Sequence, residues 1–150
     1  MFRIPLFFSL ITLFLASALL ADNTQDISSP DLSKASWMWT NPNALTVAGD
    51  LSYYRFTFRV EQPVKEATIL ITADNGYQLY INNRMIAEKA SPYTEEWSSV
   101  ERFRIEENLA TGAVNCIAIR AESLGGTACG LIVAIKIVFE DGEERCCSRG

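Results

Sequence analysis

Two groups of residues in this 150-residue chain combine aromatic rings with carboxylate and amide side chains. Sugar rings present apolar faces edged with hydroxyl groups, and exposed aromatic planes flanked by carboxylates and amides bind such rings. Both groups therefore have the composition of a carbohydrate-binding surface. The candidate carbohydrate-binding residues are Tyr93, Glu95, Glu96 and Trp97 in one segment, and Asp74, Asn75 and Tyr77 in another.

Each of these groups also has a structural interpretation that uses no ligand. Asp74 and Asn75 precede Gly76 and have the residue types of a tight turn. Trp97 is an equally good candidate for closing the hydrophobic core, as are Trp37 and Trp39, for which we favour core packing.

The composition argues against catalysis. The chain has no histidine, so a Ser-His-Asp or Cys-His arrangement in its usual form is excluded. A glycosidase would need two carboxyl groups roughly 5 to 9 Å apart across a deep cleft, and a small β-sandwich seldom supplies one. The acids nearest to aromatic residues, Asp74, Glu95 and Glu96, are therefore expected to cap turns and solvate loops. We predict that the protein is not an enzyme and uses no cofactor.

The N-terminus is predicted to direct export. Arg3 precedes an apolar run over residues 4–15, and small residues lead to Ala21. The run is shorter than the roughly 20 residues of a membrane-spanning helix, so residues 1–21 are predicted to be a cleaved signal peptide and the protein to be secreted or periplasmic. Residues 22–34 are polar and predicted to be a flexible lead-in. The net charge of −5 without a basic run argues against nucleic acid or an anionic membrane as partner.

The chain has four cysteines, and exported proteins often form disulfides. Cys116 and Cys129 lie in consecutive predicted strands and are a candidate disulfide, with two unbonded, buried thiols as the alternative. Cys146 and Cys147 are adjacent, and a bridge between them would be strained. A metal site is not predicted, because the cysteines show no repeated Cys-x2-Cys pair and no acidic loop has calcium-ligand spacing.

The elements that must position these residues are short strands. Apolar and polar residues alternate over residues 53–61, which places Tyr54, Phe56, Phe58 and Val60 toward a core. Residues 67–73 and 77–82 are predicted to form a hairpin around Asp74-Asn75-Gly76 with positive φ angles, and Asn82-Asn83 a second tight turn. Further strands are predicted at Trp37-Met38-Trp39 and over residues 85–87, 100–105, 114–121 and 129–140, with a helical turn near residues 106–109.

About eight short strands and no helix longer than a turn or two predict an all-β fold, an antiparallel jelly-roll sandwich. The chain after residue 21 is long enough for one such domain and too short for two. We assign the sandwich to residues 35–144 and a tail to residues 145–150.

Five segments together resemble the galactose-binding-like jelly roll, and most specifically the N-terminal lectin-like domain of bacterial α-L-rhamnosidases. These segments are Ala35-Ser-Trp-Met-Trp39, Tyr54-Arg-Phe-Thr-Phe58, Ala73-Asp-Asn-Gly-Tyr-Gln-Leu-Tyr-Ile-Asn82, Gly112-Ala-Val-Asn-Cys-Ile-Ala-Ile119 and Gly125-Gly-Thr-Ala-Cys-Gly-Leu131. Two features depart from the family. Asn82-Asn83 stands where its hairpin usually turns at Asn-Gly, and relatives continue into further domains, so the tail is expected to be a truncated remnant of a longer protein.

The resemblance implies a secreted, non-catalytic accessory module of a glycoside-hydrolase-type protein, one that binds carbohydrate or docks against a neighbouring catalytic domain. The alternative function is a structural or protein-interaction sandwich that packs on a catalytic partner and touches no sugar.

Overall fold

The computed structural model describes residues 30–40, 49–89, 98–124 and 129–149. Within these residues the chain forms eight strands and two single 3₁₀ turns. In chain order they are η1 (Leu32–Lys34), β1 (Asp50–Val60), β2 (Val64–Asp74), β3 (Gly76–Ile81), β4 (Arg84–Lys89), β5 (Glu101–Arg104), η4 (Glu106–Asn108), β6 (Ala113–Ser123), β7 (Gly130–Phe139) and β8 (Glu144–Arg149).

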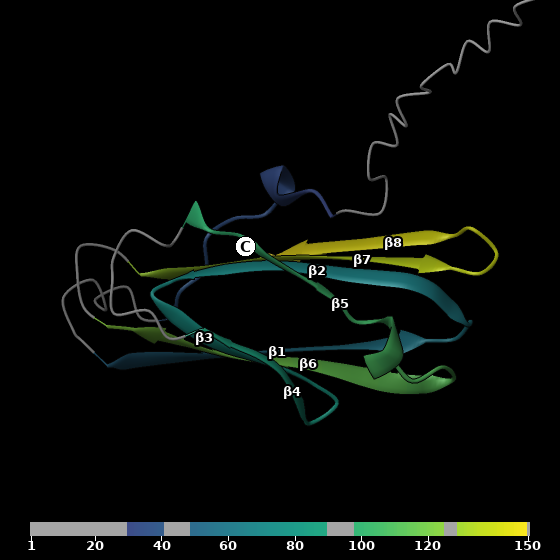
Figure 1. Cartoon of the computed structure of the whole chain (residues 1–150), viewed down its shortest axis with the longest axis horizontal. Helices are drawn as coiled ribbons and strands as arrows, with labels where there is room; N and C mark the ends of the chain where they lie inside the picture. Colours follow the sequence, from purple (N-terminus) through teal and green to yellow (C-terminus); the bar gives the residue numbers. More distant parts are fainter. Residues whose placement is uncertain (1–29, 41–48, 90–97, 125–128, 150) are drawn as a thin grey trace, which may run out of the picture.

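The strands form two four-stranded sheets that lie face to face (Figure 1). One has the order β1-β6-β3-β4 and the other β5-β2-β7-β8. Each strand pair in both sheets is antiparallel. The predicted all-β, antiparallel sandwich is confirmed.

The core lies between the sheets and is built from every second residue of the central strands. On β1 the predicted inward set is confirmed, because Val60 is fully buried and Tyr54, Phe56 and Phe58 pack against the core. The alternation of side chains along a strand gives this arrangement directly. The other buried members include Ile69, Ile71, Leu79, Ile81, Ile117, Ile119, Leu131, Ile135, Ile137 and Phe139.

The predicted hairpin around Asp74-Asn75-Gly76 is wrong. Strand β2 pairs with β5 and β7, whereas β3 pairs with β4 and β6. The segment is therefore a corner at which the chain crosses from one sheet to the other, as Figure 1 shows. None of its three residues has a positive φ, because a corner between sheets does not require the left-handed geometry of a two-residue hairpin turn.

The second predicted turn is confirmed. Asn82 and Asn83 have φ angles of 49° and 66° and join β3 to β4. Asparagine tolerates this left-handed region better than most residues, and positive φ at both central positions is the geometry of the tight hairpin turn that suits sheet twist.

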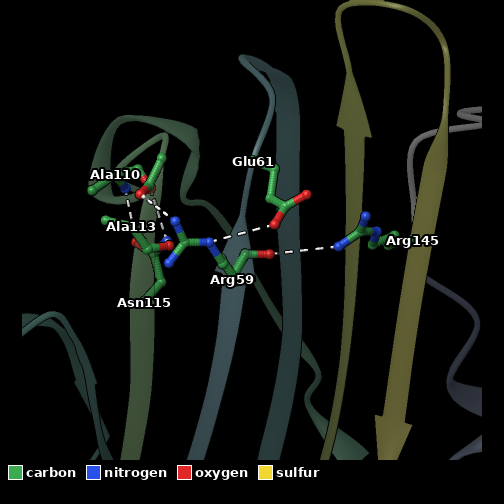
Figure 2. A network of polar contacts seen from close by, with 7 residues as sticks. Arg59, Glu61, Ala110, Ala113, Asn115 and Arg145 are labelled. Atoms are coloured by element: carbon green, nitrogen blue, oxygen red, sulfur yellow. Dashed lines mark hydrogen bonds and ion pairs between the residues drawn. The ribbon is translucent and has the colours of Figure 1, made fainter.

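The end of the sandwich that carries this turn is fixed by polar contacts (Figure 2). Asn115 is fully buried, and its Oδ1 accepts hydrogen bonds from Ala110 N at 2.7 Å and from Asn82 Nδ2 at 2.8 Å. Its Nδ2 donates to Ala110 O at 2.9 Å. Nearby, Arg145 Nη1 on β8 donates to Arg59 O on β1 at 3.5 Å. The network therefore ties both sheets together at this end.

Both ends of the predicted sandwich differ from expectation. Trp37-Met38-Trp39 makes only one β-bridge, between Met38 and Leu131, in place of a strand. Trp39 packs against the core, but Trp37 is 48 % exposed and lies over Gly130 instead of inside the sandwich. At the other terminus β8 pairs with β7 over residues 144–149, so the segment predicted to be a tail is an edge strand.

The predicted disulfide between Cys116 and Cys129 is not formed, and all four cysteines are free thiols. Cys116 lies on β6 opposite Thr57, while Cys129 directly precedes β7 in the other sheet. Cys129 lies near the end of β6 at Ser123. That end is seven residues beyond Cys116, or roughly 23 Å at about 3.3 Å per strand residue. A disulfide requires Cα atoms within about 7 Å.

Candidate functional site

The structure places three of the predicted carbohydrate-binding residues at the corner between β2 and β3. Asp74 is the most accessible of the three, being only partly buried. Its Oδ1 accepts a hydrogen bond of 2.8 Å from Asn75 Nδ2, and burial raises the pKa of its carboxyl group. Asp74 therefore keeps a carboxylate near the surface at this end of the sandwich.

Asn75 and Tyr77 do not face solvent. Asn75 is buried, and its Oδ1 accepts a hydrogen bond of 2.8 Å from Leu124 N. Tyr77 is 2 % exposed and donates its hydroxyl to Glu101 Oε2 at 2.5 Å. Because Tyr77 lies on β3 and Glu101 on β5, this bond joins the two sheets. Both side chains use their polar atoms inside the fold.

Burial is the largest cause that raises the pKa of the Tyr77 phenol, followed by the hydrogen bond to Glu101 and by the negative charge of Glu101. The phenol therefore stays protonated and donates to the carboxylate. This contact belongs to the stability of the sandwich and uses the Tyr77 hydroxyl inside the fold.

The remaining predicted residues, Tyr93, Glu95, Glu96 and Trp97, lie outside the described residues. Strand β4 ends at Lys89, which pairs with Tyr77. The chain therefore leaves β4 at the same end of the sandwich as Asp74.

Three further residues lie at this end, Trp39, Asp50 and Cys129, and the sequence reasoning did not connect them with it. Trp39 Nε1 donates to Asp50 Oδ2 at 3.1 Å and so fixes the start of β1. Burial, and then the charges of Asp50 and Asp74, raise the pKa of the Cys129 thiol. The end is thus acidic and contains a protonated thiol. Among the described residues, no group of three or more potential metal-ligating side chains is present.

A second surface lies on the outward face of the β1-β6-β3-β4 sheet, and we call it the sheet-face groove. It encloses about 370 Å³. The strand register forms two rows across it. One row is Tyr53, Arg120 and Gln78, and the other is Arg55, Ala118 and Tyr80. Because Ala118 is small and lies between Arg55 and Tyr80, it forms the floor of the groove.

The groove combines one exposed and one half-buried tyrosine ring with fixed polar groups. Tyr53 is 66 % exposed. Tyr80 donates its hydroxyl to Gln78 Oε1 at 3.2 Å, and Gln78 Nε2 donates to Glu88 Oε1 at 2.5 Å. These bonds hold the polar side chains of β3 in place. The groove therefore offers aromatic faces and hydrogen-bonding groups on a rigid sheet, which is the composition expected of a sugar-binding surface.

The sequence contained a signal for this groove. Tyr53 and Arg55 occupy the polar side of the same alternation that places Tyr54 and Phe56 in the core, and Tyr80 lies between the inward residues Leu79 and Ile81. Aromatic residues at outward positions of regular strands mark an exposed surface, because no packing explains them.

Of the comparisons with known proteins, only the one with solved structures finds similar proteins. No family model matches the sequence, and the comparison with curated proteins finds no match. Among solved structures, α-L-rhamnosidase from Streptomyces avermitilis, complexed with L-rhamnose, aligns with 81 % of this chain at a TM-score of 0.69 and 21 % sequence identity. The fold is a galactose-binding-like jelly roll. The resemblance to rhamnosidases inferred from the sequence is therefore confirmed at the level of fold.

A lectin from Pleurotus ostreatus, solved in complex with GalNAc, is also similar, with a TM-score of 0.61 and 26 % identity over 80 % of this chain. The α-L-rhamnosidase from Aspergillus terreus aligns with 77 % of the chain at 17 % identity and a TM-score of 0.62. This chain spans only 12 % of the Streptomyces enzyme, 16 % of the Aspergillus enzyme and 34 % of the lectin.

No helix among the described residues is long and apolar enough to cross a membrane.

Proposed function

We propose that this protein is an exported, non-catalytic module that binds carbohydrate through the sheet-face groove. The observation that carries the proposal is the pair of tyrosines, Tyr53 and Tyr80, on either side of the Ala118 floor. An exposed tyrosine ring on a rigid strand stacks on a sugar at low conformational cost, and the neighbouring amide and guanidinium groups bond to its hydroxyls.

Three further observations support the proposal. The similar structures include a lectin and small parts of rhamnosidases. The chain has no histidine for a nucleophilic mechanism. Export is supported by the apolar run after Arg3, which lies outside the described residues.

The acids Asp74 and Asp50 at the sandwich end form a second place where sugar hydroxyls could be bound.

The experiment is a glycan array followed by affinity electrophoresis on the purified protein. Tyr53→Ala removes the exposed ring. Burying about 70 Å² of ring face at about 25 cal/mol per Å² contributes about 1.8 kcal/mol, so affinity should fall roughly 20-fold. Val114→Ala is the matched control. Val114 is about as exposed as Tyr53 but lies on β6 outside the groove, so this change should leave the affinity unaltered.

Asp74→Asn separates the groove from the sandwich end. If this change abolishes binding while Tyr53→Ala does not, the ligand site lies at the corner between β2 and β3. Failure of the unmodified protein to bind any polysaccharide would refute the proposal.

An apolar cavity favours a second candidate function, docking on a catalytic partner. It encloses about 180 Å³ between β1 and the β7-β8 side of the other sheet. Its lining includes Met38, Tyr54, Phe56, Val133, Ile135 and Cys147. An adjacent gene for a glycoside hydrolase, and loss of a complex with its product on Met38→Glu, would support docking. Retention of that complex by Met38→Glu would count against this surface.

A further inference from the structure

The sheet-face groove contains two arginines in a chain whose net charge is −5. Arg55 lies opposite Ala118, and Arg120 lies opposite Tyr53. The two arginines are therefore diagonal neighbours on the same face of adjacent strands, where long side chains reach one another. Like charges at this spacing disfavour each other unless a counter-charge is supplied. The charged side chains that line the groove are thus both positive, whereas the protein as a whole is negative.

The two guanidinium groups differ in their partners. Arg120 Nη2 forms an ion pair of 3.1 Å with Glu122 Oε2. Arg55 Nε instead donates to Cys116 Sγ at 3.2 Å, and a thiol is a weak, neutral acceptor. Glu88, the other acid beside the groove, accepts from Gln78. Within the part of the chain that the structure describes, no ion pair neutralises Arg55.

The geometry of Arg55 suits an external carboxylate. The bond from Nε to Cys116 occupies one edge of the guanidinium plane and leaves the two Nη groups for a second acceptor. Planar carboxylates bind such a fork with two parallel hydrogen bonds, which are charge-assisted and short. Tyr53, on the same strand and face and two residues away, would then lie under the sugar ring that carries the carboxylate.

The dimensions of the groove suit a chain of sugars. Tyr53 and Tyr80 are separated by two strand spacings and by two residues along the strand. With strands about 4.8 Å apart and residues about 3.4 Å apart, their Cα atoms lie roughly 12 Å from one another. The two tyrosines would therefore stack on different rings of one oligosaccharide.

We propose that the sheet-face groove binds an acidic polysaccharide, one that contains uronic acid units, and that Arg55 pairs with the sugar carboxylate while Tyr53 and Tyr80 stack on separate rings. This inference rests on the proposed carbohydrate-binding function and names the class of glycan.

The test compares polygalacturonate with its fully methyl-esterified form, which has the same backbone without the charge. The full protein should bind the acidic polymer at least tenfold more tightly in affinity electrophoresis. Arg55→Gln should remove that preference, so that the affinity for the acidic polymer falls to about the affinity for the ester. Arg59→Gln is the matched control, because Arg59 lies on the same strand and face but contacts Glu61 and Gly112 at the other end of β1. It should keep the preference.

The outcomes separate this inference from the proposed function. Equal affinity for the two polymers, with loss of both in Tyr53→Ala, would overturn the acidic preference and leave carbohydrate binding standing. Binding of neutral glycans alone would likewise overturn the acidic preference and leave carbohydrate binding standing. Equal binding of polyglutamate and polygalacturonate would overturn the inference, because the groove would then be a general anion site. If no glycan binds at all, both proposals fail together.

Discussion

The hydrogen bond between Tyr77 and Glu101 gives the sharpest test of how the two sheets are joined. Tyr77→Phe removes the hydroxyl and keeps the buried ring, so no large cavity forms. The 2.5 Å bond joins a buried donor to a carboxylate, and hydrogen bonds to charged groups contribute about 1.5 to 3 kcal/mol. We expect the free energy of unfolding to fall by about 2 kcal/mol, and the melting temperature by about 8 °C for a domain of this size.

The pH dependence of this loss follows from the raised pKa of Tyr77. A group whose pKa is higher in the folded protein stabilises the fold fully below its unfolded pKa, near 10 for tyrosine. This contribution declines by about 1.4 kcal/mol for each pH unit above that value. The other tyrosines are present in both proteins and cancel in the difference. The cost of Tyr77→Phe should therefore shrink steadily above about pH 10.

Urea unfolding followed by fluorescence, repeated from about pH 8 to about pH 11, measures both effects. Tyr80→Phe is the control, because Tyr80 donates to Gln78 at 3.2 Å on the outward face and should change stability by less than about 0.5 kcal/mol. A similarly small loss for Tyr77→Phe, or a loss that stays constant with pH, would refute the reasoning that this bond holds the sheets together.

Three other predictions concern the core and the thiols. Asn115→Ala should cost about 2 to 4 kcal/mol in urea unfolding, because several buried partners lose their hydrogen bonds. Gly130→Ala should destabilise the protein, since the added Cβ would lie 2.6 Å from the Trp37 ring; adding Trp37→Ala should remove most of the cost in a double-mutant cycle. Cys129 should be alkylated more slowly than the exposed Cys147 near pH 8, because the pKa of its thiol is raised, and mass spectrometry of the labelled peptides checks this order.

The sequence allowed correct prediction of features that depend on neighbouring residues. The inward face of β1 and the Asn82-Asn83 turn both follow from local rules, namely the period of two along a strand and the φ preferences of asparagine. The pairing of strands does not follow from such rules. The corner at Asp74-Asn75-Gly76 has the composition of a hairpin turn, and only the distant partners of β2 and β3 distinguish the two.

The candidate site shows the same division. The alternation that correctly places Leu79 and Ile81 in the core also places Tyr77 there, and grouping it with Asp74 as a surface residue overlooked this consequence. The same alternation identifies Tyr53 and Tyr80 as outward aromatic residues. That they form one groove could not be predicted, because it depends on β6 inserting Ala118 between β1 and β3.

The strand order also determines when this protein can fold. Val60 pairs with Ala113, and Asp74 with Gly130, so β1 and β2 wait for partners in β6 and β7 that are synthesised more than fifty residues later. Until β6 and β7 emerge, the earlier strands expose unsatisfied edges, and such distant pairing slows folding and favours aggregation. A nascent chain that has not yet supplied β7 cannot complete the β5-β2-β7-β8 side of its hydrophobic interior. Chaperone occupancy should therefore fall only as the final third of the polypeptide is released.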